Sequence, residues 1–312
     1  MLFIQGAFTM RARDFGSIIK DAAEEWQKDK ASRLGAAIAY YAAFSIGPLL
    51  LLTVAVAGMI FGEEAAQGQL LEQLRALMGP DGAKAIEAML AGAKNPKAGT
   101  VATIVGSVML FFAAAGAFGA IQDALNTVWE VEPRADRGIW GIIQERFLSF
   151  TMVLGTAFLL LISLVISATL TAMSSLMGNW AQIGFIGNAT HAIISLAVIT
   201  LLFAMIFKYL PDAKVPWRAV WFGAIVTSLL FAVGKFSIGL YLGHSAVASA
   251  FGVAGSLAVL MIWLYYSAQI FLFGAELTKA YAKCSGLGIV PTKNAVRITG
   301  ESRAQQGIPK AR

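Results

Sequence analysis

Long runs without a charged residue dominate the pattern along the chain. No Asp, Glu, Lys or Arg occurs in the 29 residues after Arg33, in the 25 after Lys97 or in the 61 after Arg146. One helix of about 20 apolar residues is enough to cross the hydrocarbon core of a bilayer. The first two runs therefore predict one spanning helix each. The third predicts a hairpin of two, with its turn near 174–190.

Two further apolar segments follow Arg218, so the pattern predicts six transmembrane helices in an all-α, polytopic membrane bundle. We place the spans at approximately 36–61, 100–125, 147–172, 189–209, 218–241 and 254–278. Together they define a membrane domain that covers residues 34–285.

The composition supports a membrane protein. Hydrophobic residues make up 58% of the chain and charged residues only 13%, about half the charged share of a soluble domain. The net charge of +6 could suggest nucleic acid. The basic residues, however, lie in short segments between apolar spans, and no RNA- or DNA-binding motif accompanies them. We therefore expect the lipid bilayer, and not nucleic acid, as the partner.

The distribution of Lys and Arg predicts the orientation. Nineteen of the 24 basic residues lie in residues 1–33, in the loops 126–146 and 208–218, and in the tail from 279 onward. Cytoplasmic segments of membrane proteins carry an excess of Lys and Arg. Both termini are therefore predicted to be cytoplasmic.

Residues 1–33 form a predicted cytoplasmic N-terminal segment with an amphipathic helical pattern. Apolar residues recur in it at a spacing of three or four: Phe15, Ile18, Ile19, Ala22 and Trp26. Such a helix lies either on the inner membrane surface or against the cytoplasmic end of the bundle, and the pattern does not choose between them. Because the charged pattern begins at Met10, both Met1 and Met10 are candidate starts.

Two other segments lie outside the spans. In the loop 62–99, a stripe of leucines is interrupted at Gly79-Pro80 and resumes near Ala85. This pattern predicts two short helices that cap the extracytoplasmic face. Residues 286–312 are polar and are predicted to be a disordered cytoplasmic tail.

Polar residues at membrane depth are functional candidates, because placing them there is costly. Gln122, Asp123 and Asn126 lie at the inner end of the second span. Glu276 lies at the inner end of the sixth span, and Arg33 opens the first on the same side. These residues either form a polar network that shapes a pathway or tie the helix ends together as a structural lattice.

Three more candidates lie elsewhere in the spans. Lys235, near the outer end of the fifth span, is either a cation facing a substrate or an anchor whose ammonium reaches the headgroups. Ser45 and Pro48 lie near the middle of the first span. Pro48 removes a backbone donor and favours a kink. Such a kink marks either a binding site or a packing feature.

The sequence provides no catalytic or metal-binding pattern. The two histidines, His191 and His244, are far apart, and neither has a cysteine or carboxylate neighbour at zinc spacing. No nucleophile elbow, phosphate-binding loop or H-E-x-x-H motif is present. We therefore expect no enzyme, no cofactor and no metal.

Four groups of residues, in a fixed order, carry a family resemblance. They are Ala39-Tyr40-Tyr41 with Pro48-Leu49-Leu50, Ala124-Leu125-Asn126-Thr127-Val128-Trp129, Leu210-Pro211-Asp212 with Val215-Pro216-Trp217-Arg218, and Trp263-Leu264-Tyr265-Tyr266 with Gly274-Ala275-Glu276-Leu277. With these groups, the sequence resembles the YihY/BrkB family of bacterial inner-membrane proteins over most of residues 30–285.

The resemblance implies a multi-pass protein of the bacterial inner (plasma) membrane. The family is named partly for a member linked to resistance to serum killing, a virulence trait. Some relatives have also carried the label of the tRNA-processing ribonuclease BN. That activity belongs to a zinc enzyme with an H-x-H-x-D-H motif, which two separated histidines cannot supply.

Three functional hypotheses follow. The first is a transporter or permease-like protein for a small solute or lipid-derived molecule, favoured by a polar cavity lined by Ser45, Asn126 and Glu276. The alternative is a non-transporting envelope component that recruits partners, favoured by an exposed apolar patch on the 62–99 loop. The third, an intramembrane enzyme, requires a close pair of histidines with a nearby carboxylate. The sequence leaves open whether the protein is a homo-oligomer.

Overall fold

The computed structural model describes residues 12–93, 116–134, 183–244 and 255–308. Most of these residues are helical. The long helices are α2 (Ala31–Phe61), α6 (Ile183–Tyr209), α7 (Trp217–His244) and α9 (Gly255–Cys284), together with a shorter helix over residues 116–128. Helices therefore lie at the positions of four predicted spans and at residues 116–125 of the second, whose residues 100–115 lie outside the described residues. The third predicted span, 147–172, lies outside the described residues.

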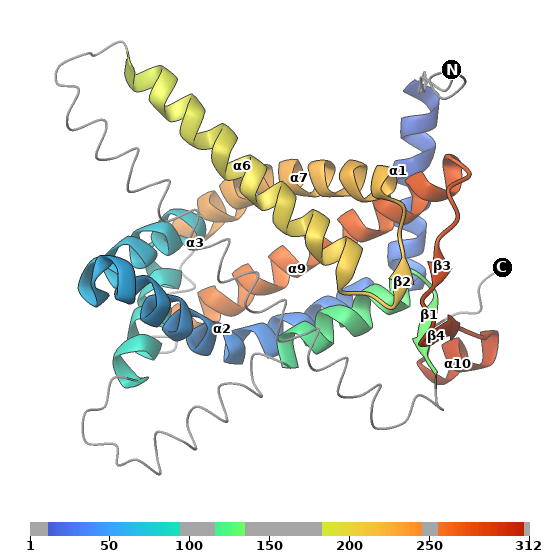
Figure 1. Ribbon diagram of the computed structural model, residues 1–312, viewed down its shortest axis with the longest axis horizontal. Coiled ribbons are helices and arrows are strands. Elements are labelled where there is room, and N and C mark those ends of the chain that lie inside the picture. Colours follow the sequence, from blue (N-terminus) through green and yellow to red (C-terminus); the bar gives the residue numbers. More distant parts are fainter. Residues whose placement is uncertain (1–11, 94–115, 135–182, 245–254, 309–312) are drawn as a thin grey trace.

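In the centre of the structure, α9 packs against both α2 and α7 (Figure 1). The helix α6 packs on α7 and also reaches α9, where the Phe207 ring lies 5.3 Å from that of Phe271. Within the described part of the chain, two segments are long and apolar enough to cross a membrane, Trp217–Ile238 and Gly255–Cys284. Each has a mean hydropathy of 1.7.

One face of α7 is apolar and is exposed with respect to the described residues. Trp221, Ile225, Leu229 and Val233 recur every four residues and are between 43% and 66% exposed. A contiguous apolar stripe of this kind suits lipid rather than water. Near the start of α7, the Trp217 ring stacks with Trp221, as in the aromatic belts found at membrane interfaces.

Glycines permit close contact between α7 and α9. A Cβ atom at Gly274 of α9 would overlap Thr227 of α7, and a Cβ at Gly223 of α7 would overlap Thr278 of α9. Each threonine hydroxyl donates to a carbonyl on its own helix, Thr227 to Gly223 at 2.6 Å and Thr278 to Gly274 at 2.8 Å. The two helices thus share a reciprocal contact in which each glycine accommodates a threonine of the other helix.

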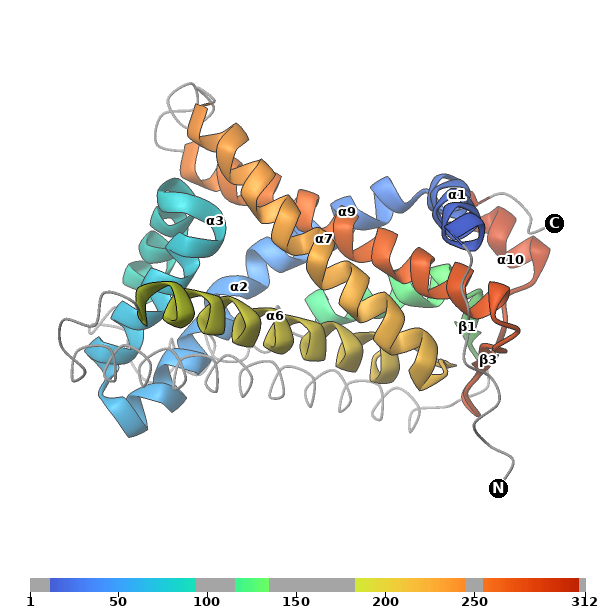
Figure 2. The same cartoon turned by 90° about the horizontal axis from the view of Figure 1, so that it is seen from above.

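The two ends of the bundle differ. At one end lie α1 (Ala12–Lys28), α10 (Gly300–Gln305) and all four strands, and we call this the strand end (Figures 1 and 2). The opposite end carries α3 (Glu63–Ala93). The N-terminal helix α1 and the C-terminal segment thus lie at the same end of the bundle, and α3 lies at the other.

The prediction of two short helices in the 62–99 segment is confirmed for the described residues. Although α3 is helical on both sides, Gly79 adopts a left-handed φ of 80° and is followed by Pro80. The buried leucines of α3, including Leu70 and Leu90, pack in one cluster with Leu260 of α9.

The amphipathic helix α1 docks on the bundle. Ile18 and Ala22 are buried, and α1 packs along α9. Phe15 and Ile19, on the flank of the same apolar stripe, remain 44% and 40% exposed. Of the two alternatives for this segment, docking against the bundle end is the one that the structure shows.

The predicted disordered tail is instead largely ordered, and this part of the sequence prediction was wrong. After α9 come β3 (Val290–Pro291), β4 (Ala295–Arg297) and α10. In two antiparallel pairs, β4 pairs with β1 (Val131–Pro133) and β3 pairs with β2 (Ala213–Lys214). The tail is anchored by the buried side chains Ala295, Arg303 and Ile308.

The reason for this error is local. The segment is polar in composition, which favours disorder. It also contains an N-terminal helix cap, which a count of polar residues does not detect. Thr299 caps α10, because its hydroxyl accepts a hydrogen bond from the Ser302 backbone N–H at 3.1 Å.

Candidate functional site

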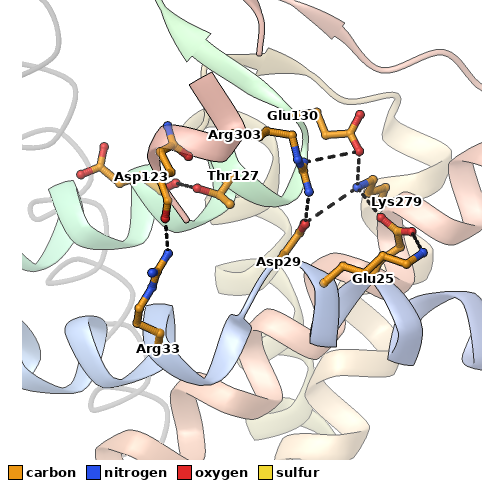
Figure 3. A network of polar contacts seen from close by, with 10 residues as sticks. Glu25, Asp29, Arg33, Asp123, Thr127, Glu130, Lys279 and Arg303 are labelled. Carbon is orange, nitrogen blue, oxygen red and sulfur yellow. Dashed lines mark hydrogen bonds and ion pairs between the residues drawn. The ribbon is translucent and has the colours of Figure 1, made fainter. Parts of the chain in front are cut away.

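A buried cluster of charged side chains lies at the strand end (Figure 3). Two turns bring its members together. Lys30, between α1 and α2, has a left-handed φ of 52°, and Glu130, after the helix 116–128, has a φ of 57°. Such values are uncommon for residues other than glycine. The first turn holds Asp29, which is fully buried, against α9.

Lys279 of α9 joins three carboxylates. Its Nζ lies 2.9 Å from Glu130 Oε1, 3.4 Å from Glu25 Oε2 and 4.0 Å from Asp29 Oδ2. Because these carboxylates belong to α1, to the turn that follows α1 and to the turn before β1, one ammonium group connects three segments of the chain.

Arg303 of α10 supplies the second cation of the cluster. Its Nη2 donates to Asp29 Oδ1 at 2.5 Å, and its Nη1 lies 3.7 Å from Glu130 Oε1. Both partners in the first contact are almost completely buried. The ion pair therefore fastens the C-terminal segment to the turn between α1 and α2, 274 residues away in sequence.

Glu276 is the most unusual member of this group. It is 1% exposed, and neither of its carboxyl oxygens accepts a hydrogen bond from a donor in the described part of the chain. Its carboxyl group lies beside that of Asp29. Buried polar groups normally have partners, so this pair of carboxyls requires an explanation.

Burial and neighbouring charge act in opposite directions on the acidic groups from the N-terminal segment. Burial raises the pKa of Asp29, and the nearby charges of Lys279 and Arg303 only partly offset this effect. Burial alone would also raise the pKa of Glu25, but the hydrogen bond from Lys28 and the charge of Lys279 lower it overall. The pKa of Asp29 is therefore raised above its ordinary value, whereas the pKa of Glu25 is lowered below its own.

A second polar group forms around Asp212, in the turn between α6 and β2. The side-chain amides of Asn126 and Gln122 donate to its Oδ2 at 2.9 and 3.3 Å. In return, the Asp212 backbone N–H donates to Asn126 Oδ1 at 2.8 Å. This two-way connection fixes the turn on the helix 116–128.

Replacing Asn126 with Ala should destabilise the folded protein by about 1–3 kcal/mol, because the half-buried Asp212 loses a donor and an acceptor of its hydrogen bonds. The measurement is the free energy of unfolding in mixed detergent micelles. Thr127→Ala is the control, since the Thr127 hydroxyl donates to the Asp123 carbonyl of its own helix at 2.9 Å. An equal loss in both variants would contradict a connecting role for Asn126.

A cavity of about 360 Å³ opens beside this second group. Two helices, one strand and the C-terminal segment contribute to its lining, which includes Arg33, Asp123, Asn126, Thr127 and Glu132 together with Gln306 and Ile308. The guanidinium of Arg33 donates to the Gln306 carbonyl at 2.7 Å, so the tail is tied to the cavity rim. The lining is mixed, because the apolar residues Leu34, Val131, Pro133 and Ile308 stand beside these polar side chains.

The predicted site residues thus fall into several places. Arg33, Asp123 and Asn126 line the cavity, Gln122 and Asn126 contact Asp212, and Glu276 lies in the charge cluster. The three remaining candidates are Ser45, Lys235 and Pro48.

Ser45 is buried on α2, where its hydroxyl donates to the Tyr41 carbonyl at 2.7 Å. Lys235 is half-buried in the C-terminal half of α7. The helix α2 continues through position 48, but the side chain of Pro48 lies outside the described residues, as do those of His191 and His244.

Sequence reasoning missed Asp29, Glu130, Arg303 and Asp212. Asp29 lies between Lys28 and Lys30, so polarity alone does not single it out. Arg303 had no usable local signal, since its partner is remote. Of the described residues, no group of three or more His, Cys, Asp or Glu side chains has an arrangement that could hold a metal ion.

Comparison with known proteins identifies the family. The sequence profile of the family described as "Virulence factor BrkB" matches residues 22–299. The chain belongs to the BrkB family. No solved structure matches it.

Relatives within the BrkB family are membrane proteins. The chain is 27% identical over 299 residues to a UPF0761 membrane protein of Alkalilimnicola ehrlichii, covering 91% of this chain and 64% of the relative. A UPF0761 membrane protein of Pseudomonas aeruginosa is 27% identical over 261 residues, covering 82% of this chain and 60% of the relative. The chain thus spans less than two thirds of the length of these relatives.

Residues that carry the BrkB resemblance meet at the strand end. Asn126, from the Ala124–Trp129 motif, binds Asp212 of the Leu210-Pro211-Asp212 motif. Trp129, which ends the Ala124–Trp129 motif, packs edge-to-face on Phe207 with ring centroids 6.1 Å apart. Glu276 of the last motif lies in the charge cluster. Members of three of the four motif groups therefore meet at this end of the bundle, whereas Ala39 and Leu50 of the remaining group pack with the leucines of α3.

Proposed function

We propose that this BrkB-family protein is a six-span transporter of the bacterial inner membrane that moves a small polar solute or a lipid-derived molecule. The observation that carries the proposal is the cavity of about 360 Å³ at the strand end. Its volume falls in the range of about 300–1,000 Å³ that is typical of small-molecule sites. The side chains that line it offer a guanidinium, carboxylates, an amide and a hydroxyl, which can together bind a polar solute.

The orientation of this cavity follows from charge. Basic residues gather at the strand end, in α1, in the turn between α6 and α7 and in the C-terminal segment, and they include Lys208, Lys214, Arg218, Lys283, Lys293 and Arg297. The positive-inside rule places this end in the cytoplasm. The cavity would then be the cytoplasmic vestibule of the transport path.

The cavity only partly matches the one expected from sequence. Asn126 lines it, whereas Ser45 and Glu276 are not among its lining residues. The partner-recruiting alternative called for an exposed apolar patch on the 62–99 segment. None of the side chains described between 63 and 93 is a large apolar group that is exposed. We therefore favour transport, and we propose no enzymatic reaction.

A flux assay in sealed proteoliposomes tests the proposal, with a panel of ions, osmolytes and lipid-like solutes. Filling the vestibule with Thr127→Leu should reduce flux at least tenfold without reducing the amount of inserted protein. Ser237→Leu is the matched control. The Ser237 hydroxyl also donates to a carbonyl one turn back on its own helix, at 3.1 Å, but it is exposed on α7 and does not line the cavity.

Three results are decisive. A flux that needs the protein and falls only in Thr127→Leu supports a transporter with this vestibule. An equal fall in both variants would place the path elsewhere. No flux across the panel, with wild-type protein correctly inserted, would overturn the proposal in favour of a partner-binding membrane component.

A further inference from the structure

Three buried carboxyl oxygens in this cluster accept no hydrogen bond from a donor within the described ranges of the chain. They are both oxygens of Glu276 and Oδ2 of Asp29, and the two carboxyl groups are adjacent. Glu276 and Asp29 are both at least 99% buried. Two ionised carboxylates in this position would repel each other in surroundings that solvate them poorly. Such a pair is stable when one proton is shared between its oxygens.

The charges around the pair also favour one bound proton. Besides the pair itself, the cluster contains the acidic groups Glu25 and Glu130 and the basic groups Lys28, Lys279 and Arg303, of which Lys28 contacts Glu25. They come from α1, the two turns, α9 and α10, which are the elements packed around the pair. Four carboxyl groups against three cations leave one negative charge in excess. One bound proton neutralises it.

A proton fits the site better than a metal cation does. Lys279 Nζ lies 4.0 Å from Asp29 Oδ2, and Arg303 is hydrogen-bonded to the other oxygen of the same carboxylate. A metal ion at this position would be repelled by both cations and would find few oxygen ligands. A proton needs only the two carboxyl oxygens that already face each other.

We propose that Asp29 and Glu276 form a proton-binding site, in which one exchangeable proton bridges the two carboxyl groups. Burial raises the pKa of Asp29, which agrees with this assignment. When the proton leaves, repulsion between the two carboxylates pushes the turn before α2 away from α9. The same turn carries the ion pair to Arg303, so the C-terminal segment that borders the vestibule would respond.

The existence of the proton site does not depend on transport. Its role as the coupling site, however, rests on the proposed function. In that role, the proton would bind from the cytoplasmic end and would couple movement of the solute to a proton gradient.

Infrared difference spectroscopy on the full-length protein in liposomes tests the site directly. The wild type should show a carboxylic-acid band at neutral pH that titrates away as the pH rises. This band should be lost or shifted in both Glu276→Gln and Asp29→Asn. It should be unchanged in Glu24→Gln, which removes an exposed carboxylate from α1. Absence of the band in the wild type, or its persistence in both site variants, would overturn the proposal.

Unfolding at several pH values gives a second readout. A raised pKa means that the folded state holds more protons than the unfolded state. Wild-type stability should therefore fall as the pH rises from the ordinary Asp value of 3.8 toward the raised pKa of Asp29. In Glu276→Gln, a neutral group of the same shape, the fall should be smaller. A variant that does not fold, or stability that depends on Na⁺ or K⁺ at fixed pH, would count against a proton site.

The two proposals fail separately. A proton gradient should drive flux in the wild type, whereas in Glu276→Gln flux should no longer respond to the gradient. If no solute moves at all, the transport proposal fails while the infrared band still decides the proton site. If solute moves but no band is found, transport stands without this site.

Discussion

Replacing Arg303 with Met should destabilise the folded protein by about 3–5 kcal/mol, the range observed when one partner of a buried ion pair is removed. Both partners of this contact are almost completely buried, so solvent does not screen it. Met retains most of the side-chain volume, and the loss therefore reports mainly on the charge. Without Arg303, Asp29 keeps only the more distant Lys279 as an opposite charge, 4.0 Å away.

The structural consequence should be release of the C-terminal segment. The ion pair joins α10 to the turn between α1 and α2, and β4 holds the same segment to β1 through three residue pairs. We expect faster tryptic cleavage at Arg297 in the Arg303→Met variant, together with a lower free energy of unfolding in mixed micelles. The cleavage assay shows where the structure opens, which unfolding alone cannot do.

Two further variants make this result specific. Arg297→Gln removes an exposed arginine of the same segment and should change the free energy of unfolding by less than about 0.5 kcal/mol. Adding Asp29→Asn to Arg303→Met should restore part of the stability, because an unpaired buried charge is then removed. If Arg303→Met unfolds like wild type, the buried ion pair does not hold the tail.

The long helices could be predicted from sequence because lipid imposes a simple rule on them. An apolar run of sufficient length must be a helix that satisfies its own backbone. The prediction for the fifth span, 218–241, therefore differs little from α7 at Trp217–His244. The sixth span was predicted to end at 278, whereas α9 continues to Cys284. That extension lies beyond membrane depth, where hydrophobicity no longer marks a helix.

The candidate site could be predicted only in part, for a related reason. Residues such as Asn126 and Glu276 stand out because they are polar near an apolar span. Asp29 and Arg303 lie in polar segments, where one more charged residue gives no signal. Their importance comes from pairing across the whole length of the chain, and no local pattern encodes such a pair. The same limitation explains why the ordered tail was missed.

The contact between α7 and α9 gives the second prediction with a large effect. Gly274→Leu should prevent stable folding, because the glycine faces the side chain of Thr227 with no space for a Cβ atom. Gly274→Ala is the milder version, and overpacking of this kind typically costs about 1–3 kcal/mol. The measurement is the free energy of unfolding for Ala, and the yield of monodisperse protein after detergent extraction for Leu.

Compensation across the interface provides the sharpest test. Thr227→Gly removes the oxygen, Cβ and Cγ2 atoms that a new Cβ at position 274 would meet, so combining it with Gly274→Ala should recover part of the lost stability. Gly68→Ala, in an open position on α3, is the control and should be neutral or slightly stabilising, since Ala favours helix.

If the double variant is no more stable than Gly274→Ala alone, close packing between the two helices is not what Gly274 provides. Recovery would instead show that the glycine of the Gly274-Ala275-Glu276-Leu277 motif serves packing while Glu276, two residues later, faces the charge cluster. One turn of α9 would then serve both the stability of the bundle and its proposed proton site.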